Sequence, residues 1–145
     1  MTEPVPPTSM PAAPGSPSAE PRPGPWIILP TYNEAENLEP IVAAILAALP
    51  AATLLVVDDG SPDGTGQIAD RLAAAEARVR VLHRTAKAGL GRAYLAGFRV
   101  ALDGGATAVL QMDADWSHDP AALPGLLAPL ADGSADLVIG SRYTP

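Results

Sequence analysis

The sequence contains no cysteine, so it can form neither a disulfide framework nor a cysteine-ligated zinc site. Aromatic residues make up only 4% of it, and any core must therefore be built from Ala, Val, Leu and Ile. Basic residues are also few: the formal net charge is −7, which argues against nucleic acid as the main partner. No apolar stretch approaches the roughly 20 residues that a membrane-spanning helix needs, and the N-terminus lacks the basic and apolar regions of a signal peptide.

What the sequence does contain changes abruptly near residue 26. Residues 1–25 hold nine prolines among small and polar residues. Such a segment cannot bury enough surface to offset the entropy lost on ordering. We therefore predict a disordered Pro-rich tail over residues 1–25 and a single domain over residues 26–145.

Within residues 26–145, short apolar runs alternate with segments of helical periodicity. The runs predict strands at residues 26–29, 54–57, 79–82, 108–112 and 137–139. The periodic segments predict helices at about residues 38–49, 65–77, 92–102 and 120–130, the last of them broken or kinked by Pro124 and Pro129. Because the strands are apolar throughout, both faces of the sheet should be covered. The order predicts an α/β, Rossmann-like, mostly parallel sheet with helices on both faces.

Polar clusters follow four of the five predicted strands. In open α/β sheets, ligands bind beyond the carboxyl ends of the strands. Polar groups gathered at that edge indicate a binding site, whereas scattered acids would indicate ordinary surface. The clusters are Tyr32–Glu34, Asp58–Ser61, Asp113–Asp115 and Ser141–Tyr143.

Asp113 and Asp115 carry the most specific chemistry. Two carboxylates about 4 Å apart repel each other by roughly 4 kcal/mol at an effective dielectric constant near 20, and a bound cation would offset that repulsion. Oxygen ligands favour Mg²⁺ or Mn²⁺ over zinc. Mg²⁺ takes one or two protein carboxylates and completes its shell with phosphate oxygens and water. The pair therefore predicts a metal–diphosphate clamp.

The roles of several neighbouring residues stay open at this stage. Asp59 can accept hydrogen bonds from a ribose or a base, or it can cap its own turn, a role that Asp58 fits equally well. Arg142 either stabilises charge on a leaving group or is a surface residue. Lys87 either lines the donor pocket or is solvated, and the Gly-rich stretch around it lacks the Walker sequence of phosphate loops. His118 has no second histidine at ligand spacing, which favours a loop-ordering role over metal ligation.

Five stretches together resemble the family 2 glycosyltransferases of the GT-A fold. More narrowly, they are similar to the polyprenol (dolichyl) phosphate mannose synthases. The stretches are Leu29–Glu34, Val57–Thr65, Gly89–Gly91, Met112–His118 and Gly140–Tyr143.

The resemblance implies GDP-mannose as the donor and assigns roles to individual residues. The residues implied to surround the guanosine are Pro30, Tyr32, Glu34, Val57 and Asp59. Asp113, Ala114 and Asp115 would meet the ribose, the diphosphate and the metal, and Ser117 stands where relatives place a further metal ligand. Arg142 would contact the donor phosphate or sugar, which makes Asp115 and Arg142 the implied catalytic residues.

The resemblance also implies a mechanism and a location. An oxygen of a polyprenyl phosphate attacks the anomeric carbon with inversion, GDP leaves, and the enzyme lies at the cytoplasmic face of the membrane as a peripheral protein. Family members continue well past the segment Gly140–Tyr143. We therefore expect a C-terminally truncated chain that binds the donor weakly without turnover.

Three other interpretations compete with a mannosyltransferase. The first is a polyprenyl-phosphate glucosyltransferase that uses UDP-glucose, and the second is a non-catalytic nucleotide-sugar binding module. The third is a haloacid-dehalogenase-like phosphatase, whose Asp-x-Asp follows the first strand. In this sequence the Asp pair follows the fourth predicted strand, so the phosphatase is disfavoured.

Overall fold

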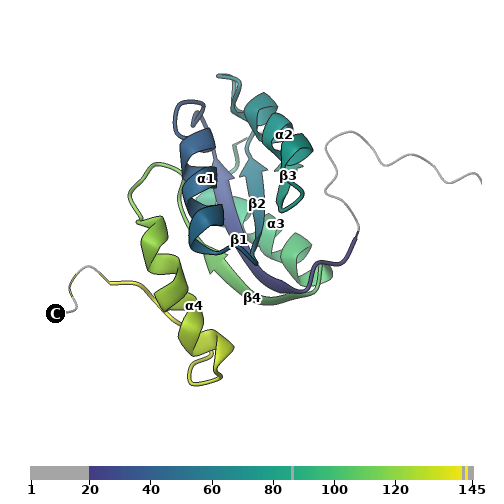
Figure 1. Ribbon diagram of the computed structural model, residues 1–145. Coiled ribbons are helices and arrows are strands. Elements are labelled where there is room, and N and C mark those ends of the chain that lie inside the picture. The colour runs from purple at the N-terminus through teal and green to yellow at the C-terminus, as the bar shows by residue number, and fades with distance from the viewer. Residues whose placement is uncertain (1–19, 86, 142, 144–145) are drawn as a thin grey trace, which may run out of the picture.

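The computed structural model describes residues 20–85, 87–141 and 143, which form a four-stranded parallel sheet with helices on both faces (Figure 1). The strand order is β3-β2-β1-β4. The strands are β1 (Gly24–Thr31), β2 (Thr53–Asp58), β3 (Val79–His83) and β4 (Ala106–Gln111). The helices are α1 (Leu38–Ala48), α2 (Thr65–Ala75), α3 (Leu90–Asp103) and α4 (Leu123–Ala131), with a 3₁₀ turn, η1 (Pro120–Ala122), before α4.

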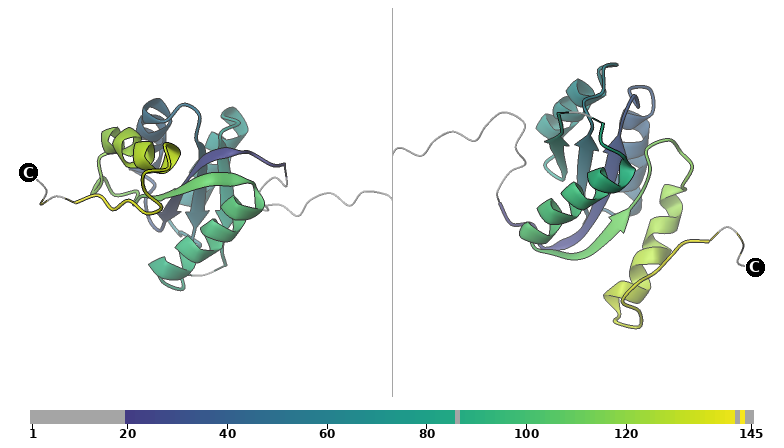
Figure 2. Two further views of the ribbon diagram at one scale, coloured as in Figure 1. Left: turned by 90° about the horizontal axis from the view of Figure 1, so that it is seen from below. Right: turned by 180° about the vertical axis from the view of Figure 1, so that it is seen from behind.

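The sheet separates two apolar clusters. Helices α1, α2 and α4 cover one face and α3 covers the other, as the front view (Figure 1) and the rear view (Figure 2) show. In β1, Ile27 and Leu29 belong to the cluster under α1, whereas Trp26 and Ile28 belong to the cluster under α3. Alternate strand residues thus face opposite layers, and this is why the strands are apolar at every position. The predicted α/β class is confirmed.

Helix α3 lies unusually close to the sheet because two glycines face it. A Cβ atom at Gly97 would lie 2.4 Å from Cγ2 of Ile28. A Cβ atom at Gly104, just after the helix, would lie 2.5 Å from the ring of Trp26. Any larger residue would have to push the helix from the sheet or displace the side chains of Ile28 and Trp26.

The predicted fifth strand is wrong. Residues 137–139 have no regular structure, and the side chains of Leu137 and Ile139 are 76% and 79% exposed. A strand needs a neighbour for its backbone hydrogen bonds, and none of the described strands pairs with this run. The chain passes α4 instead, where a Cβ atom at Gly140 would meet Leu126 at 3.6 Å.

The prolines of α4 do not break the helix in the way that we predicted. Pro124 lies in the first turn, where its missing N–H has no intrahelical partner to lose. Pro129 lies inside the helix, which ends two residues later at Ala131. The change of geometry falls earlier, between η1 and α4.

The domain begins before the predicted boundary at Trp26. Strand β1 starts at Gly24, and the backbone N–H of Arg22 donates to the carbonyl of Gly104 at 2.7 Å. The indole N–H of Trp26 donates to the carbonyl of Arg22, also at 2.7 Å. The rest of the predicted tail, residues 1–19, lies outside the described residues. Within the part of the chain that is described, no helix has the length and apolar character needed to cross a membrane.

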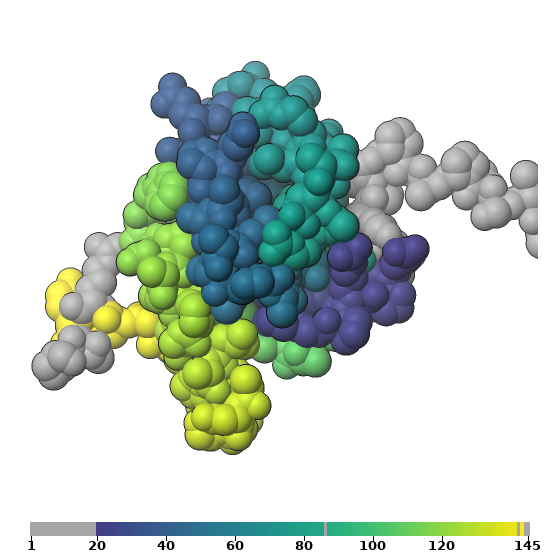
Figure 3. Space-filling model, viewed as in Figure 1, coloured from purple at the N-terminus to yellow at the C-terminus, as the bar shows by residue number. Residues whose placement is uncertain are grey.

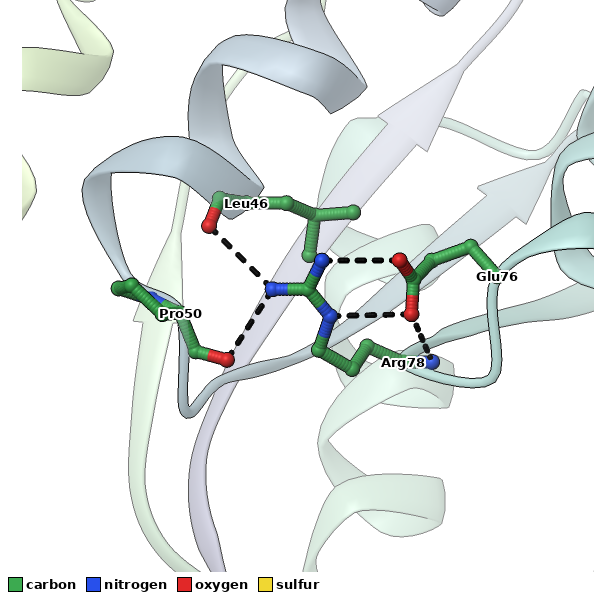
Figure 4. A network of polar contacts seen from close by, with 4 residues as sticks. All are labelled: Leu46, Pro50, Glu76 and Arg78. Atoms are coloured by element: carbon green, nitrogen blue, oxygen red, sulfur yellow. Dashed lines mark hydrogen bonds and ion pairs between the residues drawn. The ribbon is translucent and has the colours of Figure 1, made fainter.

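Arg78, directly before β3, is hydrogen-bonded to the C-terminal end of α1 and the loop after it. Its guanidinium donates to the carbonyls of Leu46 and Pro50, at 3.4 and 3.1 Å, and pairs with Glu76 through two nitrogens (Figure 4). On the face shown in the space-filling view, helix α1 lies between α2 and α4 (Figure 3). A hollow of about 430 Å³ between α1 and α2 is lined partly by Arg78 and Glu76. It contains none of the residues predicted to bind a donor.

Candidate functional site

The strand order places a topological switch point between β1 and β4. From β1 the chain proceeds to β2 and β3 on one side, and β4 then returns to the other side of β1. The carboxyl ends of such neighbouring parallel strands open the crevice in which α/β sheets bind ligands. The loop after β1 begins at Tyr32 and the loop after β4 carries Asp113, so these two predicted clusters flank the crevice.

The loops after β1 and β2 are hydrogen-bonded to each other. The backbone N–H groups of Asn33, Glu34 and Ala35 donate to the side chains of Ser61, Thr65 and Asp63, at 3.0, 2.9 and 3.1 Å respectively. Thr65 begins α2, so the two clusters and the start of that helix form one rigid unit. The side chain of Glu34 accepts a further hydrogen bond from that of Asn37, at 2.8 Å.

Adjacent Asp58 and Asp59 have different roles. Asp58 is buried and accepts hydrogen bonds from the Thr31 hydroxyl at 2.9 Å, from the Ser61 hydroxyl at 2.6 Å and from the Ser61 N–H at 3.1 Å. It therefore holds its own turn. Asp59 instead forms an ion pair with Arg84 at 2.8 Å, with side chains only 6% and 19% exposed. The ion pair holds the Asp59 carboxylate at the sheet edge, where it can accept further hydrogen bonds.

Tyr32 lies beside the loop that precedes α3. The ammonium group of Lys87 is 4.4 Å from the centre of the Tyr32 ring, and the tyrosine is 37% exposed. Pro30 and Val57 pair in register in the sheet, and both are buried. Neither side chain therefore belongs to the open surface of the sheet edge.

The loop after β4 is organised around Asp113 and Asp115. The Tyr94 hydroxyl donates to Oδ1 of Asp113 at 2.7 Å, and the Asp113 N–H donates to Nδ1 of His118 at 3.3 Å. Oδ1 of Asp115 accepts from the Ser117 N–H at 3.0 Å. Hydrogen bonding from the Ser117 side chain and backbone holds the pKa of Asp115 below its usual range. Burial, and then the hydrogen bond to Asp113, raise the pKa of Tyr94, which keeps its phenol protonated as a donor.

Two non-glycine residues with left-handed backbones lie in these loops. Asn33 has φ of 56° and Trp116 has φ of 63°. Asparagine tolerates this conformation, whereas a bulky residue such as tryptophan is a true outlier there. Trp116 stands between Asp115 and Ser117, so the strain falls on the turn that carries the candidate metal ligands.

The donor set of this loop fits a hard divalent cation. Among residues 20–85, 87–141 and 143, no group of three or more His, Cys, Asp or Glu side chains gathers as a complete metal cage. Mg²⁺ does not need one, because it takes one or two carboxylates with phosphate oxygens and water. Oδ2 of Asp113 accepts no hydrogen bond from the described residues and remains available as a ligand. Asp115 and the Ser117 hydroxyl would supply the other oxygens.

Ser141 and Tyr143 of the fourth predicted cluster do not follow a strand. Because the fifth strand does not form, Ser141 and Tyr143 follow an irregular segment, and Tyr143 is 95% exposed. Arg142 lies outside the described residues. Sequence reasoning also missed Arg84 and assigned no role to Tyr94. The only sequence signal for Arg84 is its place directly after the third predicted strand.

Comparison with known proteins identifies relatives over the same region. A family model described as Glycosyl transferase family 2 matches residues 26–145. The chain is 58% identical over 120 residues to the polyprenol monophosphomannose synthase of Mycolicibacterium smegmatis, covering 82% of this chain and 45% of that protein. It is 54% identical over 118 residues to the undecaprenyl-phosphate mannosyltransferase of Micrococcus luteus, covering 81% and 48%. The chain thus spans about half the length of these relatives.

Solved structures agree on the fold. A mannosyltransferase from Pyrobaculum calidifontis, in complex with GDP-Man and Mn²⁺, matches with a TM-score of 0.52 and 27% identity, over 71% of this chain and 31% of its own. S. aureus TarS in complex with UDP matches with a TM-score of 0.61 at 21% identity, over 84% and 38%, which is evidence for the fold alone. The predicted GT-A fold class is confirmed. The sheet-edge loops, the family match and the degree of identity lead to one conclusion: the chain belongs to glycosyl transferase family 2.

Proposed function

We propose that this chain supplies the donor-binding part of a polyprenyl-phosphate mannosyltransferase that uses GDP-mannose with Mg²⁺ or Mn²⁺. The observation that carries the proposal is the position of Asp113 and Asp115 beside the β1–β4 switch point, opposite the loop of Tyr32 and Glu34. The names of the relatives support mannosyl transfer to a polyprenyl phosphate. The Pyrobaculum enzyme's complex with GDP-Man and Mn²⁺ supports the donor and the metal.

In this proposal, Tyr32, Glu34 and Asp59 bind the guanosine. Asp59, which is paired with Arg84, accepts hydrogen bonds from N–H or O–H donors of the base or ribose. Tyr32 offers an exposed aromatic face. Buried Pro30 and Val57 support the pocket from below.

Asp113, Ala114, Asp115 and Ser117 hold the diphosphate end of the donor. Asp113 offers its Oδ2, and the lowered pKa of Asp115 keeps that carboxylate ionised at any pH near neutrality. When bound, the cation neutralises charge that develops on the leaving diphosphate. Arg142 adds a second positive charge to the same phosphates.

The reaction that follows is an inverting displacement. An oxygen of the polyprenyl phosphate forms a bond to the anomeric carbon of mannose, the bond from that carbon to GDP breaks, and GDP leaves with the electron pair. An anionic phosphate is already nucleophilic, so the site needs no strong protein base. Its work is to position the donor and to stabilise the leaving group. The lipid acceptor places the reaction at a membrane surface.

Calorimetric titration with GDP-mannose, with and without Mg²⁺, tests the donor and the metal. We expect Mg²⁺ to strengthen binding in the wild type and to have no effect in an Asp113→Asn, Asp115→Asn double variant. An Asp103→Asn, Asp136→Asn double variant is a matched control, because it removes the same charge from exposed positions elsewhere. Equal affinity of the wild type and the site variant in Mg²⁺ would refute the assignment.

A parallel titration with UDP-glucose tests the competing glucosyltransferase. We expect GDP-mannose to bind more tightly than UDP-glucose under the same conditions. The opposite order would replace mannosyl transfer with glucosyl transfer while leaving the metal site intact.

A further inference from the structure

Tyr94 joins α3 to the candidate metal loop. It lies in the first half of α3, and its hydroxyl reaches across the sheet edge to Oδ1 of Asp113 at 2.7 Å. Asp113 follows β4, at the other side of the switch point from the loops that carry the remaining acidic residues. The hydrogen bond therefore links α3 directly to the Asp113 carboxylate.

The position of the Tyr94 hydroxyl is fixed by packing. Ala93, the residue before Tyr94, is 1% exposed. Gly97, one helical turn after Ala93, lies so close to Ile28 that no side chain fits there. The rings of Tyr94 and Phe98 stack with centroids 6.1 Å apart. The ring of Tyr94 therefore has little freedom, and its hydroxyl is a fixed donor and not a mobile one.

The fixed hydroxyl of Tyr94 restricts the orientation of the Asp113 carboxylate. The terminal torsion of an aspartate is broad, so an unrestrained carboxylate presents its two oxygens in many orientations. The Tyr94 hydroxyl occupies Oδ1, whereas Oδ2 accepts no hydrogen bond from the described residues. Meanwhile the Asp113 N–H is held by the ring of His118. The backbone and one carboxylate oxygen are thus both restrained, and Oδ2 is the oxygen that has no hydrogen bond from the described residues.

We propose that Tyr94 is a positioning residue, which orients Asp113 so that Oδ2 faces the divalent cation and the donor diphosphate. The proposal rests on the proposed function, since it assumes that Asp113 binds the cation. Partners that orient metal ligands in this way usually change metal affinity 10- to 100-fold when they are removed. Tyr94 does not itself touch the donor.

The test compares Tyr94→Phe with Phe98→Leu. The first variant removes only the hydroxyl, and the second disturbs the same packing without removing a hydrogen-bonding group. For each protein, the dissociation constant of GDP is measured by calorimetry in saturating Mn²⁺ and in EDTA, and the ratio of the two constants gives the effect of the metal. Mn²⁺ binding in the presence of GDP is followed independently by electron paramagnetic resonance, and thermal unfolding reports stability.

We expect Tyr94→Phe to lower the metal effect about tenfold while leaving GDP affinity in EDTA unchanged. Phe98→Leu keeps the Tyr94 hydroxyl but removes the ring that it stacks on, so it should lower the unfolding temperature and reduce the metal effect less than Tyr94→Phe does. An unchanged metal effect in Tyr94→Phe, or an equal loss of affinity in Mn²⁺ and in EDTA, would overturn the positioning role and leave the proposed function standing. A wild type whose GDP affinity does not respond to Mn²⁺ would overturn both.

Discussion

Replacing Gly97 with alanine should destabilise the domain, although alanine is the better helix former. The added methyl group would lie 2.4 Å from Cγ2 of Ile28 and 3.3 Å from Cγ2 of Val57. Carbon atoms pack best at about 3.5–4.0 Å. Helix α3 must therefore move roughly 1 Å from the sheet, or the two strand side chains must leave their preferred rotamers.

The magnitude follows from two opposing terms. Forcing an extra methyl group into a packed core costs about 1–3 kcal/mol. Exchanging glycine for alanine inside a helix returns about 1 kcal/mol. The two terms leave a net loss of about 0–2 kcal/mol in the free energy of unfolding, and we expect the upper half of that range because the 2.4 Å contact is far shorter than the best packing distance. Gly91→Ala, in the same helix, is the matched control: nothing lies within 4 Å of its added carbon, so it should be neutral or stabilising by up to about 1 kcal/mol.

Urea unfolding followed by circular dichroism would measure both variants. Gly97→Ala should lower the urea midpoint, whereas Gly91→Ala should raise it or leave it unchanged. Adding Ile28→Ala to Gly97→Ala tests the cause, because the double variant should lose less than the sum of the single losses. The reasoning fails if Gly97→Ala is as stable as the wild type, or if the two losses simply add.

The remaining predictions concern charges. Arg84→Met leaves buried Asp59 without its partner and should lower the free energy of unfolding, measured in urea, by about 3 kcal/mol. Arg71→Met breaks an exposed ion pair and should lower it by no more than about 0.5 kcal/mol. Equal losses would contradict the argument from burial. Arg78 lowers the pKa of Glu76 to about 2 from 4.5, so the stabilisation by Glu76 is present above pH 4.5 and disappears as the pH falls towards 2. The stability difference between the wild type and Glu76→Gln, measured by urea unfolding across that range, should shrink accordingly, and a difference that grows on acidification would contradict it.

The elements that sequence reasoning predicted well depend on local patterns. Continuous apolar runs located all four strands of the sheet, and Gly104 marked the end of α3. The run at residues 137–139 has the same local character but forms no strand. Whether such a run pairs depends on a neighbour far away in the chain, and local pattern contains no information about that neighbour.

The same limit applies to the candidate site. The positions of Asp59 and Asp113 at strand ends were predictable, but their partners Arg84 and Tyr94 lie 25 and 19 residues away along the chain. No motif connects these pairs, because helix packing and strand order bring them together. The turn-holding role of Asp58 was one of the alternatives that the sequence left open, whereas the ion pair of Asp59 was not predicted.

The central position of β1 has a consequence for how the chain acquires its fold during synthesis. Trp26 pairs with Thr53 of β2 and with Val109 of β4, and the second partner lies about three times as far along the chain. Closing the longer loop costs about 1 kcal/mol more entropy. We expect β1, β2 and β3 to associate while β4 is still emerging from the ribosome. During that time the edge of β1 that later pairs with β4 has no partner. The loop that carries Asp113 would then reach the crevice after the loops that follow β1 and β2.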